Sequence, residues 1–103
     1  MRVLLQASIP AKEGNEHVRK GTLGSTIQKI LDELKPEAAY FVANDDGERS
    51  AFLVLDMKES SDLPRLAEPF FLAFNARVHV RPTMTPQDLA AAAPHIEKAA
   101  KAY

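Results

Sequence analysis

The residues of this sequence best placed to do chemistry are six polar side chains that strand alternation puts on one face of a predicted sheet. They are Gln6, Ser8, Asp56, Arg77, His79 and Arg81. If the first and last strands are neighbours, hydrogen-bond donors, an acceptor and an imidazole converge there. An imidazole titrates near neutral pH, so His79 could act as a general acid or base. Arg77 and Arg81 could clamp a carboxylate or stabilise an enolate.

The same six residues also fit a role without chemistry. Polar alternation on one face of a sheet is common, and the cluster could be a solvated rim. Arg77 or Arg81 could equally form a salt bridge to an acid across a subunit interface. A row of arginine, histidine and arginine suits an anion better than a metal. If this face holds a ligand, we expect a small organic molecule.

Other chemical motifs are weak or missing. The chain has no cysteine, which excludes disulfides, zinc–thiolate sites and thiol nucleophiles. Its histidines, His17, His79 and His95, lack the spacing of a helical ligand pair. Residues 21–26 superficially suggest a phosphate loop, but they lack its lysine and fall in a helical pattern. We predict no metal site and no cofactor.

The charge balance and the lack of a long apolar segment argue against nucleic acid and membranes as partners. The 13 basic and 14 acidic side chains among 103 residues leave a formal net charge of −1. Such a balance provides no overall attraction to nucleic acid or to anionic lipid. No segment approaches the roughly 20 apolar residues of a spanning helix. We expect a single cytoplasmic domain over residues 1–103 that contacts neither nucleic acid nor membrane.

The first half of the chain predicts a strand, a helical region and a hairpin. Residues 2–9 alternate as a strand, and helical spacing runs from about residue 15 to residue 34. Gly21 and Gly24 interrupt that spacing, so the region is either one helix with a weak point or a turn followed by a helix from Ser25. Two apolar runs, residues 38–44 and 49–57, flank an Asp-Asp-Gly turn that is typical of a hairpin.

The second half predicts a helix, a strand and a final helix. Ser60 or Ser61 is a candidate N-cap for an apolar stripe that Pro69 should kink or split. Residues 76–82 alternate as the last strand. A helix over about residues 86–102 then packs on the core or on a partner. Its apolar stripe consists of Leu89, Ala93, Ile96, Ala100 and Tyr103, with a bend at Pro94 and a cap at Thr85.

Four aromatic residues could line a pocket for a flat ligand. They are Tyr40, Phe70, Phe71 and Phe74. Their spacing is explained more simply if all four belong to the core between helices and sheet.

The order of elements predicts an α+β ferredoxin-like βαββαβ sandwich, with a four-stranded antiparallel sheet plus a C-terminal helix. In residues 68–82, a proline–aromatic step runs into an alternating strand that ends with proline. With the βαββαβ order over residues 1–84, this stretch resembles the dimeric α/β-barrel superfamily, distantly its muconolactone isomerase-like members. The resemblance implies a homodimer in which bare sheet faces pair and the C-terminal helix packs across the dimer. It leaves the chemistry open.

Three functions remain open from the sequence. The leading hypothesis is a homodimeric α/β-barrel protein whose paired sheets or helix–sheet cleft hold a small organic molecule without transforming it, or hold nothing. The first alternative is a cofactor-independent isomerase or monooxygenase-type enzyme that acts on a small metabolite, with His79 as acid or base. The second alternative is a regulatory or interaction dimer without catalysis.

Overall fold

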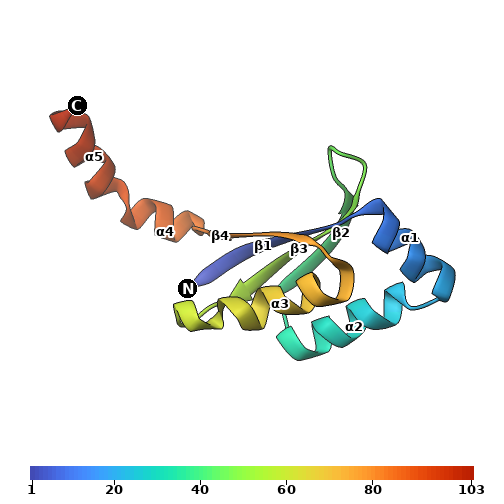
Figure 1. Ribbon diagram of the computed structural model, residues 1–103. Helices are drawn as coiled ribbons and strands as arrows, with labels where there is room; N and C mark the ends of the chain where they lie inside the picture. The colour runs from blue at the N-terminus through green and yellow to red at the C-terminus, as the bar shows by residue number, and fades with distance from the viewer.

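The protein is a ferredoxin-like α+β sandwich with an extended C-terminal arm, as a computed structural model of residues 1–103 shows (Figure 1). Its strands are β1 (Arg2–Ile9), β2 (Ala38–Ala43), β3 (Arg49–Asp56) and β4 (Arg77–Pro82). They form one antiparallel sheet in the order β2-β3-β1-β4. This confirms the predicted fold class.

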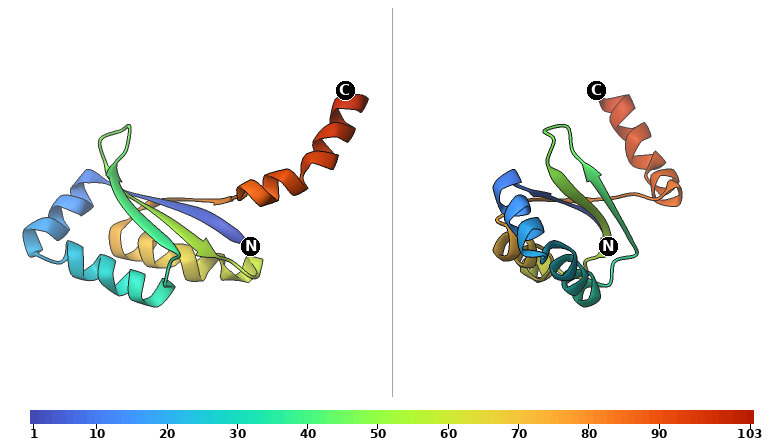
Figure 2. Two further views of the ribbon diagram at one scale, coloured as in Figure 1. Left: turned by 180° about the vertical axis from the view of Figure 1, so that it is seen from behind. Right: turned by 90° about the vertical axis from the view of Figure 1, so that its right-hand side faces the viewer.

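The helices of the sandwich all cover the same face of the sheet (Figure 2). They are α1 (Ala11–Lys20), α2 (Leu23–Leu34), the short 3₁₀ helix η1 (Ser60–Asp62) and α3 (Leu63–Phe74). The core between the layers is apolar, with Leu5, Leu53 and Phe74 fully buried. No helix covers the opposite face, which we call the open face. None of the helices is long and apolar enough to cross a membrane.

The helical region after β1 differs from the sequence prediction. Two helices occupy it, and the first begins at Ala11, several residues before the predicted start. The break falls at Gly21, whose φ of 71° lies in the left-handed region, and its amide donates to the carbonyls of the last turn of α1. Glycine adopts this conformation without a steric penalty, so it ends α1 and allows the chain to turn into α2.

The hairpin and α3 follow the sequence more closely. Gly47, with a φ of 75°, occupies the turn between β2 and β3 as predicted. The cap before η1 is Glu59 and not Ser60 or Ser61: the Glu59 amide donates to the Asp62 carboxylate at 3.3 Å, and the Asp62 amide donates to the Glu59 carbonyl at 3.0 Å. Helix α3 continues through Pro69 without a split. Its buried face against the sheet compensates for the hydrogen bond that proline cannot donate.

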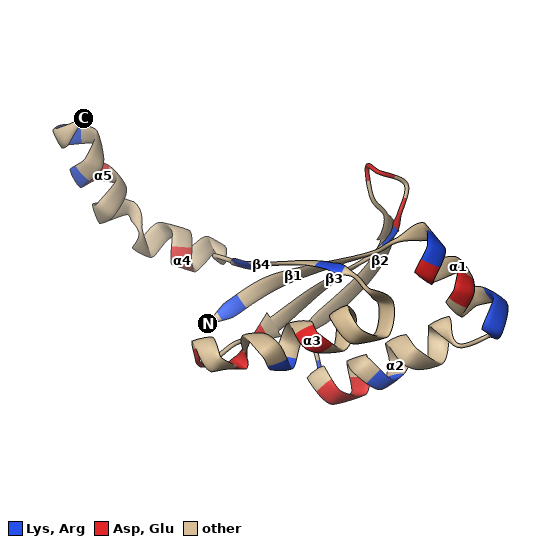
Figure 3. Cartoon of the chain, viewed as in Figure 1, with Lys and Arg blue, Asp and Glu red and all other residues tan.

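The C-terminal arm consists of α4 (Pro86–Ala91) and α5 (Ala93–Ala102), which replace the single predicted helix. The chain bends at Ala92, and Pro94 lies in the first turn of α5, where proline is tolerated. No residue of the arm is buried, and the arm projects from the sandwich with few charged residues (Figure 3). The radius of gyration is 16.8 Å, against about 13 Å for a compact chain of this length.

Candidate functional site

The open face brings most of the predicted site residues together. In the sheet register, Gln6 lies opposite His79, and Ser8 lies opposite Arg77. These four residues line one cleft of about 560 Å³ beside the hairpin, which we call the open-face cleft. Arg81 pairs with Leu4 one step further along the same face and does not line the cleft.

Asp56 does not join this cluster. It pairs with Arg2 at the far end of β1, and its carboxylate accepts a hydrogen bond from the N-terminal amine at 3.1 Å. A residue at that position cannot orient the His79 imidazole within one chain. The register, which the sequence alone does not state, decides this separation.

The side chains of the open-face cleft differ in whether they already make hydrogen bonds or ion pairs within the chain. The Arg77 guanidinium is ion-paired with Glu48. Ser8 is buried, and its hydroxyl accepts hydrogen bonds at 3.3 Å from Asn44 Nδ2 and from the Ser50 hydroxyl. His79 is exposed and makes no side-chain hydrogen bond within the chain. A general acid or base needs a partner at hydrogen-bond distance, so the role of His79 remains a prediction.

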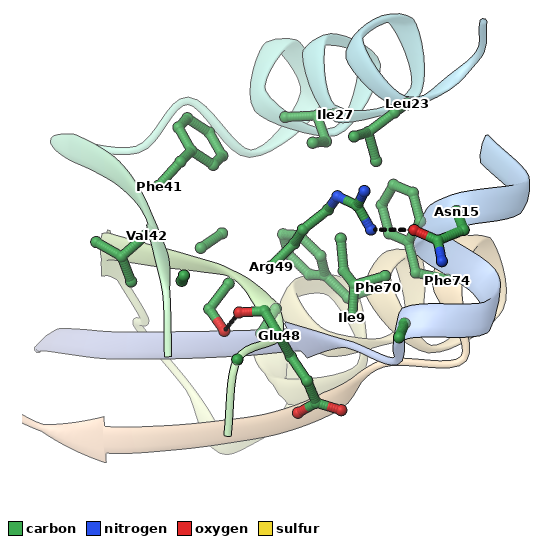
Figure 4. Close-up of a pocket in the computed structure, with 16 residues that line it drawn as sticks. Ile9, Asn15, Leu23, Ile27, Phe41, Val42, Glu48, Arg49, Phe70 and Phe74 are labelled. Atoms are coloured by element: carbon green, nitrogen blue, oxygen red, sulfur yellow. Dashed lines mark hydrogen bonds between the residues drawn. The ribbon is translucent and has the colours of Figure 1, made fainter. Parts of the chain in front are cut away.

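A larger pocket lies on the opposite side of the sheet, between the sheet and the helices (Figure 4). This helix–sheet pocket has a volume of about 650 Å³, and 11 of its 16 lining residues are hydrophobic. Its most prominent apolar side chains are Leu23, Ile27, Phe41, Phe70 and Phe74. The pocket is flanked by β2, one of the two edge strands of the sheet.

The aromatic residues divide between the two faces in a way that the sequence did not predict. Phe70 and Phe74 are buried in the helix–sheet core, as expected. Tyr40 is 66% exposed and lies on the open face, in register with Phe52, because adjacent residues of a strand point to opposite sides. Phe71 is 42% exposed on the outer side of α3. The prediction that all four are core residues is therefore wrong for these two.

Arg49 is the residue of the helix–sheet pocket that sequence reasoning missed. It begins β3 on the face that continues with Ala51, Leu53 and Leu55, which are all buried. Its Nη1 donates to Asn15 Oδ1 at 3.0 Å, across the mouth of the pocket (Figure 4). The available signal was an arginine in phase with a buried apolar series.

Gly14 makes room for this arginine. It is the buried residue of α1, and a Cβ built on it would lie 2.7 Å from Arg49 Nη1. A side chain at this position would push the guanidinium away from its present place. Because the contact is with the far end of a flexible side chain, an alanine at position 14 would displace the guanidinium at little cost to the fold.

Arg49 has no acidic partner. The ion pairs of the chain are Met1 with Asp56, Arg2 with Glu37, Arg65 with Asp62, and Arg77 with Glu48. Although Glu48 precedes Arg49 and borders the pocket, its carboxylate points away from the pocket (Figure 4) and is ion-paired with Arg77. Arg2 forms a two-pronged hydrogen bond that lowers the pKa of Glu37, well away from both pockets.

His17 supports the walls of the helix–sheet pocket. Its Nε2 lies 2.9 Å from the Ala73 carbonyl, which can only accept, so Nε2 carries a proton. Its Nδ1 lies 2.8 Å from the Thr22 hydroxyl, which can donate to it when the ring is neutral. The ring also meets Phe74 edge to face, with centroids 4.7 Å apart. His17 therefore ties α1 to α3 and to the start of α2.

Comparisons with known proteins give little beyond the fold. No protein-family model matches the chain, and no curated protein matches it. Among solved structures, a formyltetrahydrofolate deformylase from Pseudomonas putida KT2440 aligns with a TM-score of 0.48 and 14% sequence identity. The alignment covers 81% of this chain and 29% of the deformylase chain, so this chain matches less than a third of that protein.

Proposed function

We propose that this chain is a small-molecule-binding protein that works as a homodimer. The observation that carries the proposal is the helix–sheet pocket, whose volume of about 650 Å³ and apolar lining are those of a site for a small organic molecule. The pocket combines many hydrophobic residues with a few polar groups at one end, an arrangement that buries an apolar body and orients it.

Two unpartnered surfaces support the homodimer. The open face carries apolar residues on every strand but β4: Leu4, Ala38, Tyr40, Val42, Phe52 and Val54. The arm carries Leu89, Ile96 and Tyr103, all exposed. A monomer would leave both surfaces in water, whereas pairing with a second copy would bury them. The resemblance to dimeric α/β-barrel proteins of the muconolactone isomerase-like type agrees with this arrangement.

The homodimer is tested by placing a charge on the open face. We expect Tyr40→Asp to shift the protein from dimer to monomer in sedimentation and light-scattering measurements, because an unpaired carboxylate would be buried in the interface. Leu72→Asp is the matched control, since Leu72 is 82% exposed on the helix layer. A wild-type chain that is monomeric at every concentration would refute the dimer.

Binding is tested by titrating isotope-labelled protein with small aromatic and aliphatic compounds and recording amide spectra. We expect shifts at Leu23, Ile27 and Phe41, which line the helix–sheet pocket. Amide shifts confined to residues of the open face would indicate that the ligand binds there and not in the helix–sheet pocket. No saturable shift with any compound would remove the binding proposal and leave a regulatory or interaction dimer.

A cofactor-independent enzyme is the second candidate, favoured by the shared cleft of Gln6, Ser8, Arg77 and His79. Pairing of two open faces would enclose this cleft and could supply the partner that His79 lacks. An isomerase that uses His79 as a base would exchange a carbon-bound proton of a carboxylated substrate with solvent. The test is deuterium incorporation into a panel of enolisable acids, with His79→Gln as the inactive variant. No exchange by the dimer would count against catalysis.

A further inference from the structure

We infer that the ligand of the helix–sheet pocket is a monocarboxylate with an apolar body, and that Arg49 binds its carboxylate. This inference rests on the proposed function and adds the chemical class of the ligand. It joins three observations: an arginine on the core-facing side of the sheet, a glycine that makes room for it, and the lack of any acidic partner.

The position of Arg49 places a positive charge at one end of an apolar space. Arg49 itself is exposed, whereas the residues that follow it on the core-facing side of β3, Ala51, Leu53 and Leu55, are buried and apolar. In Figure 4, the Arg49 side chain runs along the pocket and its guanidinium reaches Asn15 on α1. The phenylalanines of α3 and the aliphatic residues of α2 line the space beside it. A ligand there would have its apolar body against these side chains and its charged end at Arg49.

The guanidinium has donors left for a ligand. Arginine presents five N–H groups in a planar fork, and the structure commits one nitrogen, Nη1, to Asn15. The amide oxygen of Asn15 is neutral, so it orients the guanidinium without cancelling its charge. A fork with free donors matches two carboxylate oxygens in a bidentate pair.

The charge of the site favours a carboxylate over a phosphate. Arg49 is the only cationic residue among those that line the helix–sheet pocket. One guanidinium neutralises a single negative charge, whereas a phosphate monoester carries about −1.5 to −2 charges near neutral pH. Glu48, the only acidic lining residue, is held by Arg77 and is turned away from the pocket.

The experiment compares ligand pairs that share an apolar body and differ in whether the head group is a carboxylate or a neutral hydroxyl: octanoate with octanol, and naphthoate with naphthol. Affinities come from amide-shift titrations of the full chain. We expect wild type to bind the carboxylate about tenfold or more tightly than its neutral partner, as a charge-assisted hydrogen bond allows. Arg49→Met should abolish this preference and leave the affinity for the neutral compound nearly unchanged.

Three further variants separate charge from geometry. Arg49→Lys keeps the charge but loses the fork, and should retain only part of the preference. Gly14→Ala keeps the arginine but displaces its guanidinium, and should also weaken carboxylate binding. Arg81→Met removes an arginine from the opposite side of the sheet that makes no contact with Glu48, and should change nothing in the helix–sheet pocket.

The outcomes distinguish this inference from the proposed function. Equal affinity of wild type for charged and neutral partners would overturn the carboxylate inference and leave small-molecule binding intact. A preference that survives in Arg49→Met would also overturn it. Tighter binding of octyl phosphate than of octanoate would assign the pocket to a phosphate instead. If none of the compounds binds wild type, the proposed binding function fails together with the inference.

Discussion

Removal of residues 85–103 tests whether the arm is an interface element. Within one chain the deletion should cost the sandwich less than about 0.5 kcal/mol, because no residue of α4 or α5 is buried and surface changes are typically that small. The melting temperature of a monomer would then stay nearly the same. Any large effect of the deletion must come from contacts with a second copy.

The effect on a dimer can be worked from the exposed apolar side chains. Leu89 is 51% exposed, Ile96 is 57% exposed and Tyr103 is fully exposed. Complete burial of a large apolar side chain contributes about 1.5–3 kcal/mol, so burial of the exposed fractions contributes about 3–6 kcal/mol per arm. This figure is an upper estimate, because it assumes that all three side chains become completely buried in the dimer. Even its lower end corresponds to a more than hundredfold weaker dimer.

Sedimentation over a range of protein concentrations measures this change, and small-angle scattering reports the shape. We expect the truncated chain to dissociate at concentrations where the full chain is dimeric. Ile96→Ser should weaken the dimer in the same direction, while Lys98→Ser, outside the apolar stripe, should not. A truncated dimer with the dissociation constant and melting temperature of the full chain would refute the reasoning.

Three further predictions concern the sandwich itself. Phe74→Ala should lower the free energy of unfolding by about 3–5 kcal/mol in urea titrations, since Phe74 is fully buried, and Phe71→Ala should cost far less because Phe71 is exposed. Backbone hydrogen bonds from Glu59 and Lys58 lower the pKa of Asp62, so its stabilisation is present above the unfolded value of 3.8 and is lost as the pH falls through the folded value. Below about pH 4, the free energy of unfolding should therefore depend less on pH in Asp62→Asn than in wild type. The same slope of unfolding free energy against pH in both proteins would contradict this. Lys35 ends α2 with a φ of 48°, so Lys35→Gly should raise the stability by up to about 1 kcal/mol, and a lower melting temperature would count against that explanation.

The sequence by itself determined the elements with strong local signals. Alternation in residues 2–9 predicted β1 with its correct bounds, since one face of that strand is wholly buried. The Asp-Asp-Gly turn predicted the hairpin, and the Thr85 cap with Asp88 predicted the start of α4, because glycine and capping side chains act on their own backbone. The order of these elements was sufficient for the ferredoxin-like fold.

Tertiary structure alone decided which face of the sheet each β2 side chain occupies and which residues meet in the helix–sheet pocket. Residues 38–43 are nearly all apolar, so periodicity could not tell whether Tyr40 or Phe41 faces the helices; the register with β3 puts Phe41 on the helix side. The polar anchor of the pocket joins Arg49 to Asn15, which are 34 positions apart in the sequence. No local pattern encodes such a contact, because it depends on how α1 packs beside the sheet. The sequence likewise showed an apolar stripe on the arm, and only the structure revealed that the chain's own core does not bury it.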